Sequence, residues 1–322
     1  MKLIKTLWIV SVLLLTSCMP SIMDMTRQLP DREIYRLPSS DNSDLTWITS
    51  SMMIVKDFNT ETKLWSFDTG TKNLYPIKIS TDCTKLFVRS LQRLPDQKAG
   101  FILDCPKTKS QIIHEISVNS DHSLEIYVEA SITWLGNFAY SQDKKELMLV
   151  EENGVGLASS LYYQSNAGDR INITPDFQRA DYPVWSPTEN AVAFVGTKLI
   201  PDSNDDTKTW GETKNLFDYP WKVYIYDIDD SFIKELPVEI IHPGRFKWSP
   251  NGRWLGFTGK YKGIPGVWII DLETDFKVIR VVDQIASFDF SPDGNSIAYI
   301  GNSSVEGYDA IKVVELMTDK FP

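Results

Sequence analysis

The feature that most constrains the fold is a thirteen-residue segment that recurs along the chain. Its clearest copies begin at Pro183, Phe246 and Phe288, and weaker copies begin at Ile77 and Phe138. Each copy has an aromatic-rich strand that ends at Ser, a turn of the Pro-Asp-Gly type and a second, apolar strand. Because proline fixes φ and Gly or Asn tolerates positive φ, every copy predicts a β-hairpin. The recurrence therefore predicts repeated small sheets rather than one continuous core.

The spacing of the repeat predicts the architecture. The turn serines are Ser80, Ser141, Ser186, Ser249 and Ser291, which are separated by 61, 45, 63 and 42 residues. The two shorter spacings match a four-stranded propeller blade, and the two longer ones require inserted loops. We therefore predict an all-β chain that forms a six-bladed β-propeller of four-stranded antiparallel blades.

The blade count rests on segments outside the five serine turns. A sixth blade is predicted before the first turn, with strands within 45–55, 63–68 and 73–76. Segment 34–37 is the candidate outer strand of the last blade, which would otherwise end on an exposed edge. Seven blades is the alternative, because 119–128 could form a further, degenerate hairpin.

The N-terminus predicts export. Residues 1–17 combine Lys2 and Lys5 with an apolar run over 7–15 that is too short to span a bilayer. The small residues that precede Cys18 resemble the lipobox of bacterial lipoproteins. The resemblance implies cleavage before Cys18 and a diacylglycerol on its sulfur. An ordinary signal peptide followed by a chance cysteine is the alternative.

The lipoprotein resemblance also predicts the domain organisation and the location. Residues 18–33 have no apolar period and are predicted to be a tether, so that 34–322 form the propeller domain. Met19 is not the Asp that marks inner-membrane retention. The expected location is the cell envelope, at the outer membrane if one is present and otherwise on the outer face of the cytoplasmic membrane.

The charge balance limits the partners. The chain has a formal net charge of -10, and loss of Lys2 and Lys5 with the signal peptide makes it -12. A domain this acidic has no broad basic surface for nucleic acid and should not lie flat on anionic lipid. We expect a monomer that contacts the membrane through the lipid on Cys18, with an envelope protein or peptide as its partner.

Two further cysteines form a candidate disulfide. Cys83 and Cys105 are an even pair in a chain that is expected to be exported. A hairpin centred near residue 94 would place Val88 opposite Gly100 and Cys83 opposite Cys105, close enough to bridge. Two buried free thiols are the alternative.

The hairpins carry a family resemblance. The Ser-Pro-Asp-Gly turn is followed by aromatic third strands, as in 223–227 and 267–271. This pattern resembles the WD-repeat-like propeller repeat of TolB-like proteins over residues 45–322. The resemblance implies a propeller that docks a protein or peptide on one face.

The sequence contains no catalytic motif. His114, His122 and His242 lie in different segments without metal-ligand spacing, and we predict neither a metal nor a cofactor. The function predicted is a non-catalytic module for protein–protein interaction or ligand binding. A carbohydrate-active propeller enzyme, a glycoside hydrolase or lyase with paired carboxylates at the central channel, is the alternative.

The longest connection is the candidate partner-binding loop. It covers 197–220, between the second and third strands of its blade, and a loop of this length in a compact domain is functional or disordered. Its aromatic candidates, including the one that follows the loop, are Trp210, Phe217, Tyr219 and Trp221. Segments 92–98 and 154–163 are expected to join the same pair of strands in other blades, so that all three would project from one face.

Overall fold

The computed structural model is built of β-strands and turns. It describes residues 31–38, 43–57, 63–77, 79, 87–105, 110–118, 124–132, 135–153, 158–198 and 220–316. Within these ranges the chain forms 24 strands and no helix. Accordingly, no helix in the described ranges is long and apolar enough to cross a bilayer.

The strands follow one another in antiparallel sets of four, numbered here from the first set to the sixth. The first three sets are β2 (Asp44–Thr49), β3 (Met52–Asp57), β4 (Lys63–Asp68) and β5 (Asn73–Ile77); β6 (Phe87–Leu94), β7 (Lys98–Cys105), β8 (Ser110–Val118) and β9 (Leu124–Ile132); and β10 (Leu135–Tyr140), β11 (Leu147–Asn153), β12 (Ala158–Gln164) and β13 (Arg170–Asn172).

The next three sets complete the described strands. They are β14 (Phe177–Trp185), β15 (Ala191–Lys198), β16 (Trp221–Asp227) and β17 (Phe232–Ile241); β18 (Phe246–Trp248), β19 (Trp254–Tyr261), β20 (Ile264–Asp271) and β21 (Lys277–Val282); and β22 (Phe288–Phe290), β23 (Ser296–Asn302), β24 (Tyr308–Glu315) and β1 (Asp31–Pro38). The sets form separate sheets, except that short β12–β14 and β17–β19 pairings link the third, fourth and fifth sets into one sheet of 12 strands.

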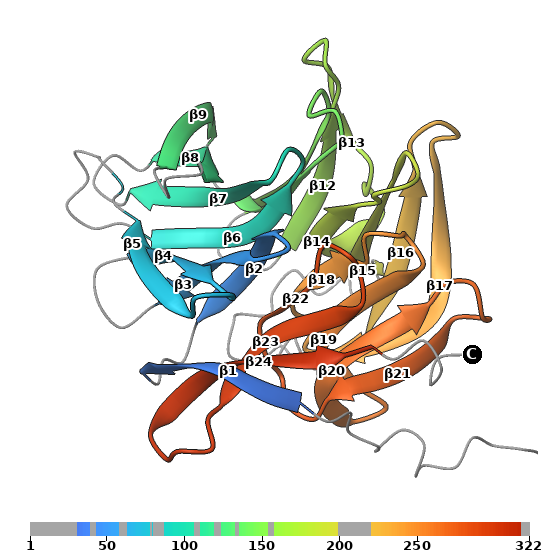
Figure 1. The fold of residues 1–322 in the computed structure, drawn as a ribbon. Helices are drawn as coiled ribbons and strands as arrows, with labels where there is room; N and C mark the ends of the chain where they lie inside the picture. The colour runs from blue at the N-terminus through green and yellow to red at the C-terminus, as the bar shows by residue number, and fades with distance from the viewer. Residues whose placement is uncertain are drawn as a thin grey trace, which may run out of the picture.

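The sets stand around a common axis (Figure 1). The first strand of each set contacts the first strand of the next in the order β2, β6, β10, β14, β18 and β22, and β22 contacts β2 again. Neighbouring sets bury apolar faces against each other, as where Ile54 and Leu64 of the first set meet Val88 and Phe101 of the second. Each sheet alternates its side chains between two faces, so both faces need a neighbour.

The first and last strands of the chain close the ring. β1 pairs antiparallel with β24, with Arg36 opposite Ala310, and Figure 1 shows β1 in blue along β24 in red. Leu37 is buried in the cluster that also contains Leu45 and Ile311. The outer strand predicted over 34–37 is therefore confirmed, and its partner is the edge that would otherwise be exposed.

The serine turns have the chemistry that the sequence predicts. The Ser291 hydroxyl donates to Asp293 at 2.6 Å and accepts from the backbone N–H of Ser296 at 3.0 Å. Ser249 makes the equivalent bonds to Asn251 and to the backbone N–H of Trp254. These side chains cap their own turns, which is a structural role.

The repeat predicted at 77–89 is wrong, because its two halves belong to different sheets. β5 pairs with β4, whereas β6 pairs with β7. The equivalent turn of the second set is Pro95–Gln97, in which Asp96 and Gln97 have φ of 60° and 57°. The first strands end at Thr49, Leu94, Tyr140, Trp185, Trp248 and Phe290, at spacings of 45, 46, 45, 63 and 42 residues. The extra length therefore lies in one set, which contains the connection from 199 to 219.

The register that supported the disulfide is also wrong. Val88 lies opposite Leu103 and not opposite Gly100, because the hairpin turns at 95–97 and β6 carries a bulge between Arg89 and Gln92. Cys105 ends β7, opposite Ser110 of β8. Cys83 lies outside the described residues, so the disulfide stays a prediction without its geometric support.

The segment that made seven blades the alternative belongs to the second set. Its described part begins at Leu124, in β9, and pairs with β8 along nearly the whole strand. Residues 119–123 lie outside the described ranges. β9 is thus the fourth strand of its sheet.

The ring has two different faces, because successive antiparallel strands run in opposite directions. We call the face with the first-to-second turns the turn face, and the opposite face, where the first strands begin, the loop face. Connection 154–157 and the longer one after Lys198 both leave from the loop face, since each joins a second strand to a third. Segment 92–98 joins β6 to β7 and lies on the turn face. The prediction that all three project from one face is wrong for this segment.

Candidate binding site in the central channel

Two cavities lie along the axis, one at each face. The loop-face cavity has a volume of about 410 Å³ and is lined by residues from every set, among them Ser43, Gln92, Asn137, Tyr182, Lys247 and Ile285. The turn-face cavity has about 360 Å³ and is lined by turn residues such as Asp96, Gln142 and Pro250. Gln92, Val184 and Lys247 line both cavities and therefore lie between them.

One side of the loop-face cavity is an arc of polar side chains from three sets. The Ser90 hydroxyl donates to the Asn137 side-chain carbonyl, and the Asn137 amide donates to Asp181 at 2.6 Å. Ser90, Asn137 and Asp181 each lie at a β-bulge of their own strand. A bulge re-aims side chains, and here Ser90 and Tyr182 adopt φ of 53° and 54°. The bulges turn polar groups of β6, β10 and β14 toward one another.

The opposite side of this cavity is built around Asp44. Its carboxylate pairs with the guanidinium of Arg245, the residue before β18, and accepts a hydrogen bond from the Ser287 hydroxyl at 2.6 Å. Asp44 is fully buried. Lys56 lies near it on β3, and burial lowers the pKa of Lys56 to about 8 even though the charge of Asp44 opposes this shift.

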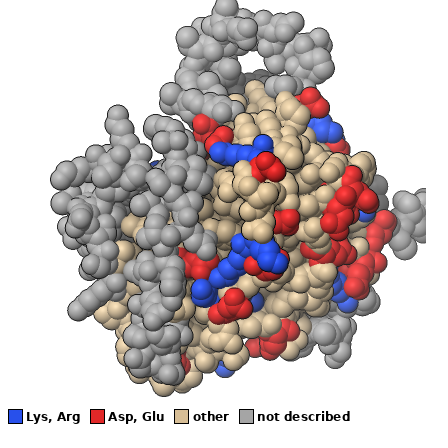
Figure 2. Space-filling view, turned by 90° about the horizontal axis from the view of Figure 1, so that it is seen from above, with Lys and Arg blue, Asp and Glu red and all other residues tan. Residues whose placement is uncertain are grey.

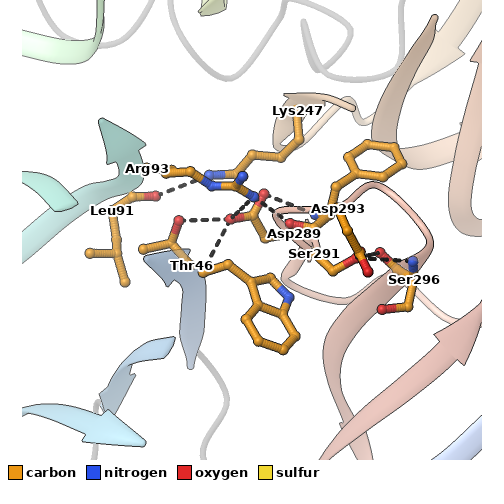
Figure 3. A network of polar contacts seen from close by, with 10 residues as sticks. Thr46, Leu91, Arg93, Lys247, Asp289, Ser291, Asp293 and Ser296 are labelled. Carbon is orange, nitrogen blue, oxygen red and sulfur yellow. Dashed lines mark hydrogen bonds and ion pairs between the residues drawn. The ribbon is translucent and has the colours of Figure 1, made fainter. Parts of the chain in front are cut away.

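Asp289 is the centre of a second network, nearer the turn face (Figure 3). It accepts hydrogen bonds from the Thr46 hydroxyl at 2.8 Å and from the backbone N–H of Trp47 at 2.9 Å. The guanidinium of Arg93 lies 3.5 Å from the same carboxylate and also donates to the carbonyl of Phe290. The network joins β2, β6 and β22, so it holds three first strands together.

Lys247 extends from β18 into the space between the two cavities. Its side chain is buried, and its ammonium donates to the carbonyl of Leu91 at 3.5 Å. It forms no ion pair with any residue that the structure describes. Burial lowers the pKa of Lys247, although the charges of Asp289 and Asp44 act in the opposite direction.

Burial also shifts the pKa values of two residues of the polar arc, Asp181 and Tyr182. It raises the pKa of Asp181, against the hydrogen bond from Asn137. It raises the pKa of the neighbouring Tyr182 to about 12. Asp181 therefore binds a proton more readily than an exposed Asp does.

The residues singled out in the sequence lie elsewhere. Cys18, Cys83, Trp210, Phe217 and Tyr219 lie outside the described residues. Trp221 is the first residue of β16 and is 1% exposed within an apolar cluster. Its assignment to the partner-binding loop is therefore corrected, because a core tryptophan cannot contact a partner.

The histidines do not form a site in the described part of the chain. His114 is buried in β8, where its ring stacks on Phe101 at a centroid distance of 5.4 Å. Burial lowers the pKa of His114. His242 follows β17, and His122 lies outside the described residues. No group of three His, Cys, Asp or Glu side chains among the described residues is placed to hold a metal ion.

The polar residues of the channel recur near one position of the repeat, which the turn motif does not mark. They lie three to five residues before the end of each first strand, as the end points of these strands show: Asp44, Ser90, Asn137, Asp181, Arg245 and Ser287. A polar residue before each turn would have been the signal. It was hidden because the repeat was aligned on Ser80 instead of on the turn at Pro95.

Acidic side chains outnumber basic ones in the chain, by 43 to 33. Figure 2 shows Asp and Glu spread over one face, with Lys and Arg in smaller groups among them. Within the channel, Lys56, Arg93, Arg245 and Lys247 accompany the ion-paired carboxylates Asp44 and Asp289. The channel of this acidic protein therefore contains four cations beside these two carboxylates.

Antiparallel sheets that pack face to face around a polar channel define a β-propeller. Within that class, the chain has a TolB-like fold. It is similar to TolB from Acinetobacter baumannii, with 18% identity over 90% of this chain and a TM-score of 0.56. The chain spans 65% of the length of that TolB chain.

Propeller enzymes are similar at the same level. An oligogalacturonate lyase in complex with manganese has 10% identity over 92% of this chain and 100% of its own, with a TM-score of 0.54. A gluconolactonase from Xanthomonas campestris has 11% identity over 92% of each chain and a TM-score of 0.54. No family model and no curated protein sequence matches the chain. Likenesses at this identity establish the fold, and function must be argued from the site.

Proposed function

We propose that the protein is a non-catalytic binding module that receives a segment of a partner protein or peptide at the loop-face mouth of its channel. The observation that carries this proposal is the loop-face cavity of about 410 Å³, to which every set contributes lining residues. A pocket on the axis of a rigid ring is a typical ligand site. The TolB-like resemblance of the sequence implies the same use of one face.

The lining of the mouth suits a peptide. Ile285 is 51% exposed and lies at the rim, where it offers an apolar anchor. The Asn137, Ser90 and Tyr182 side chains add hydrogen-bonding groups beside it. An apolar anchor with a few placed polar groups gives both affinity and orientation.

Substitution at the rim tests the proposal. The full chain and its Ile285→Asp variant would be used to capture cross-linked partners from envelope extract, with quantitative mass spectrometry as the readout. Phe232→Asp is the matched control, because Phe232 is 61% exposed on β17, away from the lining of the mouth. We expect Ile285→Asp to lose at least tenfold in capture and Phe232→Asp to retain it. Equal capture by the two variants would contradict a site at the mouth.

The connection from 199 to 219 is a proposed second element of the interface. Its ends leave the loop face, the same face as the mouth, and it carries Trp210, Phe217 and Tyr219. Aromatic side chains are frequent anchors in interfaces. Deletion of 202–218 should remove the partners that Ile285→Asp also removes, and an unchanged set of partners would contradict the role of the loop.

We also propose that a lipid on Cys18 anchors the protein in the cell envelope. The supporting observation is the apolar run over 7–15 followed by small residues and Cys18. Two or more acyl chains hold a protein stably at a membrane. The full chain should enter the detergent phase in a Triton X-114 partition, whereas Cys18→Ser should remain in the aqueous phase. Identical partitioning of both proteins would exclude a lipid on this residue.

A carbohydrate-active enzyme is the second candidate function. Burial raises the pKa of Asp181, which is the direction of shift that a general acid requires. The likeness to an oligogalacturonate lyase and a gluconolactonase suggests the substrates to try. Polygalacturonate and gluconolactone would be incubated with the protein, its Asp181→Asn variant and the control Asp143→Asn. Turnover that only Asp181→Asn abolishes would support an enzyme, and no turnover on either substrate would favour the binding module.

A further inference from the structure

One buried cation in the channel, Lys247, has no ion pair with the residues that the structure describes. Three cationic side chains follow one another between the two faces: Arg245 lines the loop-face cavity, Lys247 lines both cavities, and Arg93 lines the turn-face cavity. Arg245 pairs with Asp44, and Arg93 pairs with Asp289. Lys247 has no carboxylate within ion-pairing distance among the described residues, and its one hydrogen bond there is the 3.5 Å contact with Leu91.

The lost hydration of the Lys247 ammonium is only partly replaced by contacts within the described residues. The Lys247 side chain is only 8% exposed, so its ammonium has given up most of its water. A buried charge is costly unless it is paired and hydrogen-bonded. The neutral carbonyl of Leu91 at 3.5 Å replaces little of that hydration. An anion should therefore bind Lys247 with a more favourable free energy than it would bind an exposed lysine.

We propose that Lys247 binds a carboxylate of the ligand that enters the loop-face mouth. The inference rests on the proposed function and names the chemistry that the site selects. A carboxylate fits because the two carboxylates already in the channel pair with neighbouring cations in the same way. The ligand group is either an acidic side chain or the carboxyl terminus of a peptide, and both present the same anion to Lys247.

Access is from the loop face. The cavity there has about 410 Å³, and Lys247 lies in its lining together with Arg245 and Phe246. The chain has a formal net charge of -10, so the protein as a whole does not attract an anionic ligand. Binding of a carboxylate would thus be specific to the channel cations.

Small probes test the proposal without a known partner. The melting temperature of the full chain would be measured at constant ionic strength with N-acetylglycine, which has a terminal carboxylate, and with N-acetylaspartic acid α-amide, which has a side-chain carboxylate. N-acetylglycinamide is the neutral control. A ligand at free concentration L that binds the folded state stabilises it by RT ln(1 + L/Kd), so the melting temperature rises with the concentration of the ligand. We expect at least one carboxylate probe to raise the melting temperature with this logarithmic dependence on concentration, and the probe with the lower Kd identifies the ligand group.

Variants assign the effect to Lys247. Lys247→Met should weaken the apparent Kd of the carboxylate probe at least tenfold, whereas Lys247→Arg should stay within a few fold. Lys145→Met is the matched control, because the Lys145 side chain is 62% exposed and remote from the lining of the channel. Equal binding by wild type and Lys247→Met, or equal binding of the neutral probe, would overturn the proposal. These outcomes do not depend on partner capture by Ile285→Asp, so the two proposals fail separately.

Discussion

Asp289 of β22 accepts a 2.8 Å hydrogen bond from the Thr46 hydroxyl of β2, two residues that lie 243 positions apart in the sequence. This contact joins the first strand of the last set to the first strand of the first set. At the outer edge, the pairing of β1 with β24 joins the same two ends of the chain. The ring is therefore closed twice, by side chains at its axis and by backbone hydrogen bonds at its rim.

Loss of the carboxylate at the axis should destabilise the ring. Asp289→Asn places an amide where the Thr46 hydroxyl and the Trp47 N–H now donate to a carboxylate, and it leaves Arg93 without its anion. Breaking a buried, hydrogen-bonded ion pair costs about 3–5 kcal/mol. Urea unfolding followed by tryptophan fluorescence would measure the loss. Asp143→Asn, in an exposed turn, should change the free energy of unfolding far less, and similar losses for both variants would contradict the role of Asp289.

Weakening the packing of β1 against its neighbours should also lower the free energy of unfolding. Leu37 of β1 is 6% exposed and packs with Leu45 and Ile311 across the junction. Leu37→Ala should lower the free energy of unfolding by about 2–4 kcal/mol, because it leaves a cavity in this cluster. It should also promote aggregation, since β24 becomes an exposed edge when β1 detaches. Chemical denaturation and light scattering would test both effects. Val305→Ala is the control, because Val305 is 40% exposed, and an equal loss there would refute this account.

Gly294 is expected to contribute to stability only through its backbone conformation. Gly294 has a φ of +74°, and a Cβ at this position would meet only Pro250 Cδ, at 3.5 Å. Gly294→Ala should therefore cost about 1 kcal/mol through the left-handed conformation and not through a clash. Thermal unfolding would measure it against Gly70→Ala, at a turn glycine whose φ is not positive. A loss of several kcal/mol for Gly294→Ala would mean that a steric clash contributes.

Lys56 should titrate well below an ordinary lysine. Its pKa is about 8 instead of 10.5, because burial disfavours the charged ammonium. In the window from about pH 8 to 10.5 the unfolded chain binds this proton and the folded chain does not, so this group makes the free energy of unfolding rise with pH. Below pH 8 both states are protonated, and the group adds no slope. A titration followed by NMR of ¹³C-labelled lysine would locate the midpoint, with Lys56→Met to assign the signal. A midpoint near 10.5 would contradict the burial of its charge.

Local structure that depends on neighbours along the chain could be predicted from the sequence. The Ser-Pro-Asn-Gly turn at Ser249 and the Ser-Pro-Asp-Gly turn at Ser291 formed as predicted, since the groups that cap them are two to five residues apart. Strand pairing across the junction was also predicted, because an unpaired edge at the last set needs a strand and 34–37 was the apolar segment left over. The prediction of the repeat was wrong in the second set, where the turn motif is weak. Pro95 and Asp96 carry part of the turn motif without its serine and glycine, so Ser80 was taken in their place.

Sequence by itself determined the unit of the fold: a hairpin with fixed turn chemistry, repeated often enough to require several sheets. Only the tertiary structure decided which polar residues meet. Asp44 and Arg245 are 201 positions apart, and Asn137 reaches Asp181 only because bulges in β10 and β14 turn both toward the axis. The physical reason is that local propensity acts over a few residues, whereas the channel is formed by closing a ring, and the phase and bulges of each strand decide which side chains face the space at its centre.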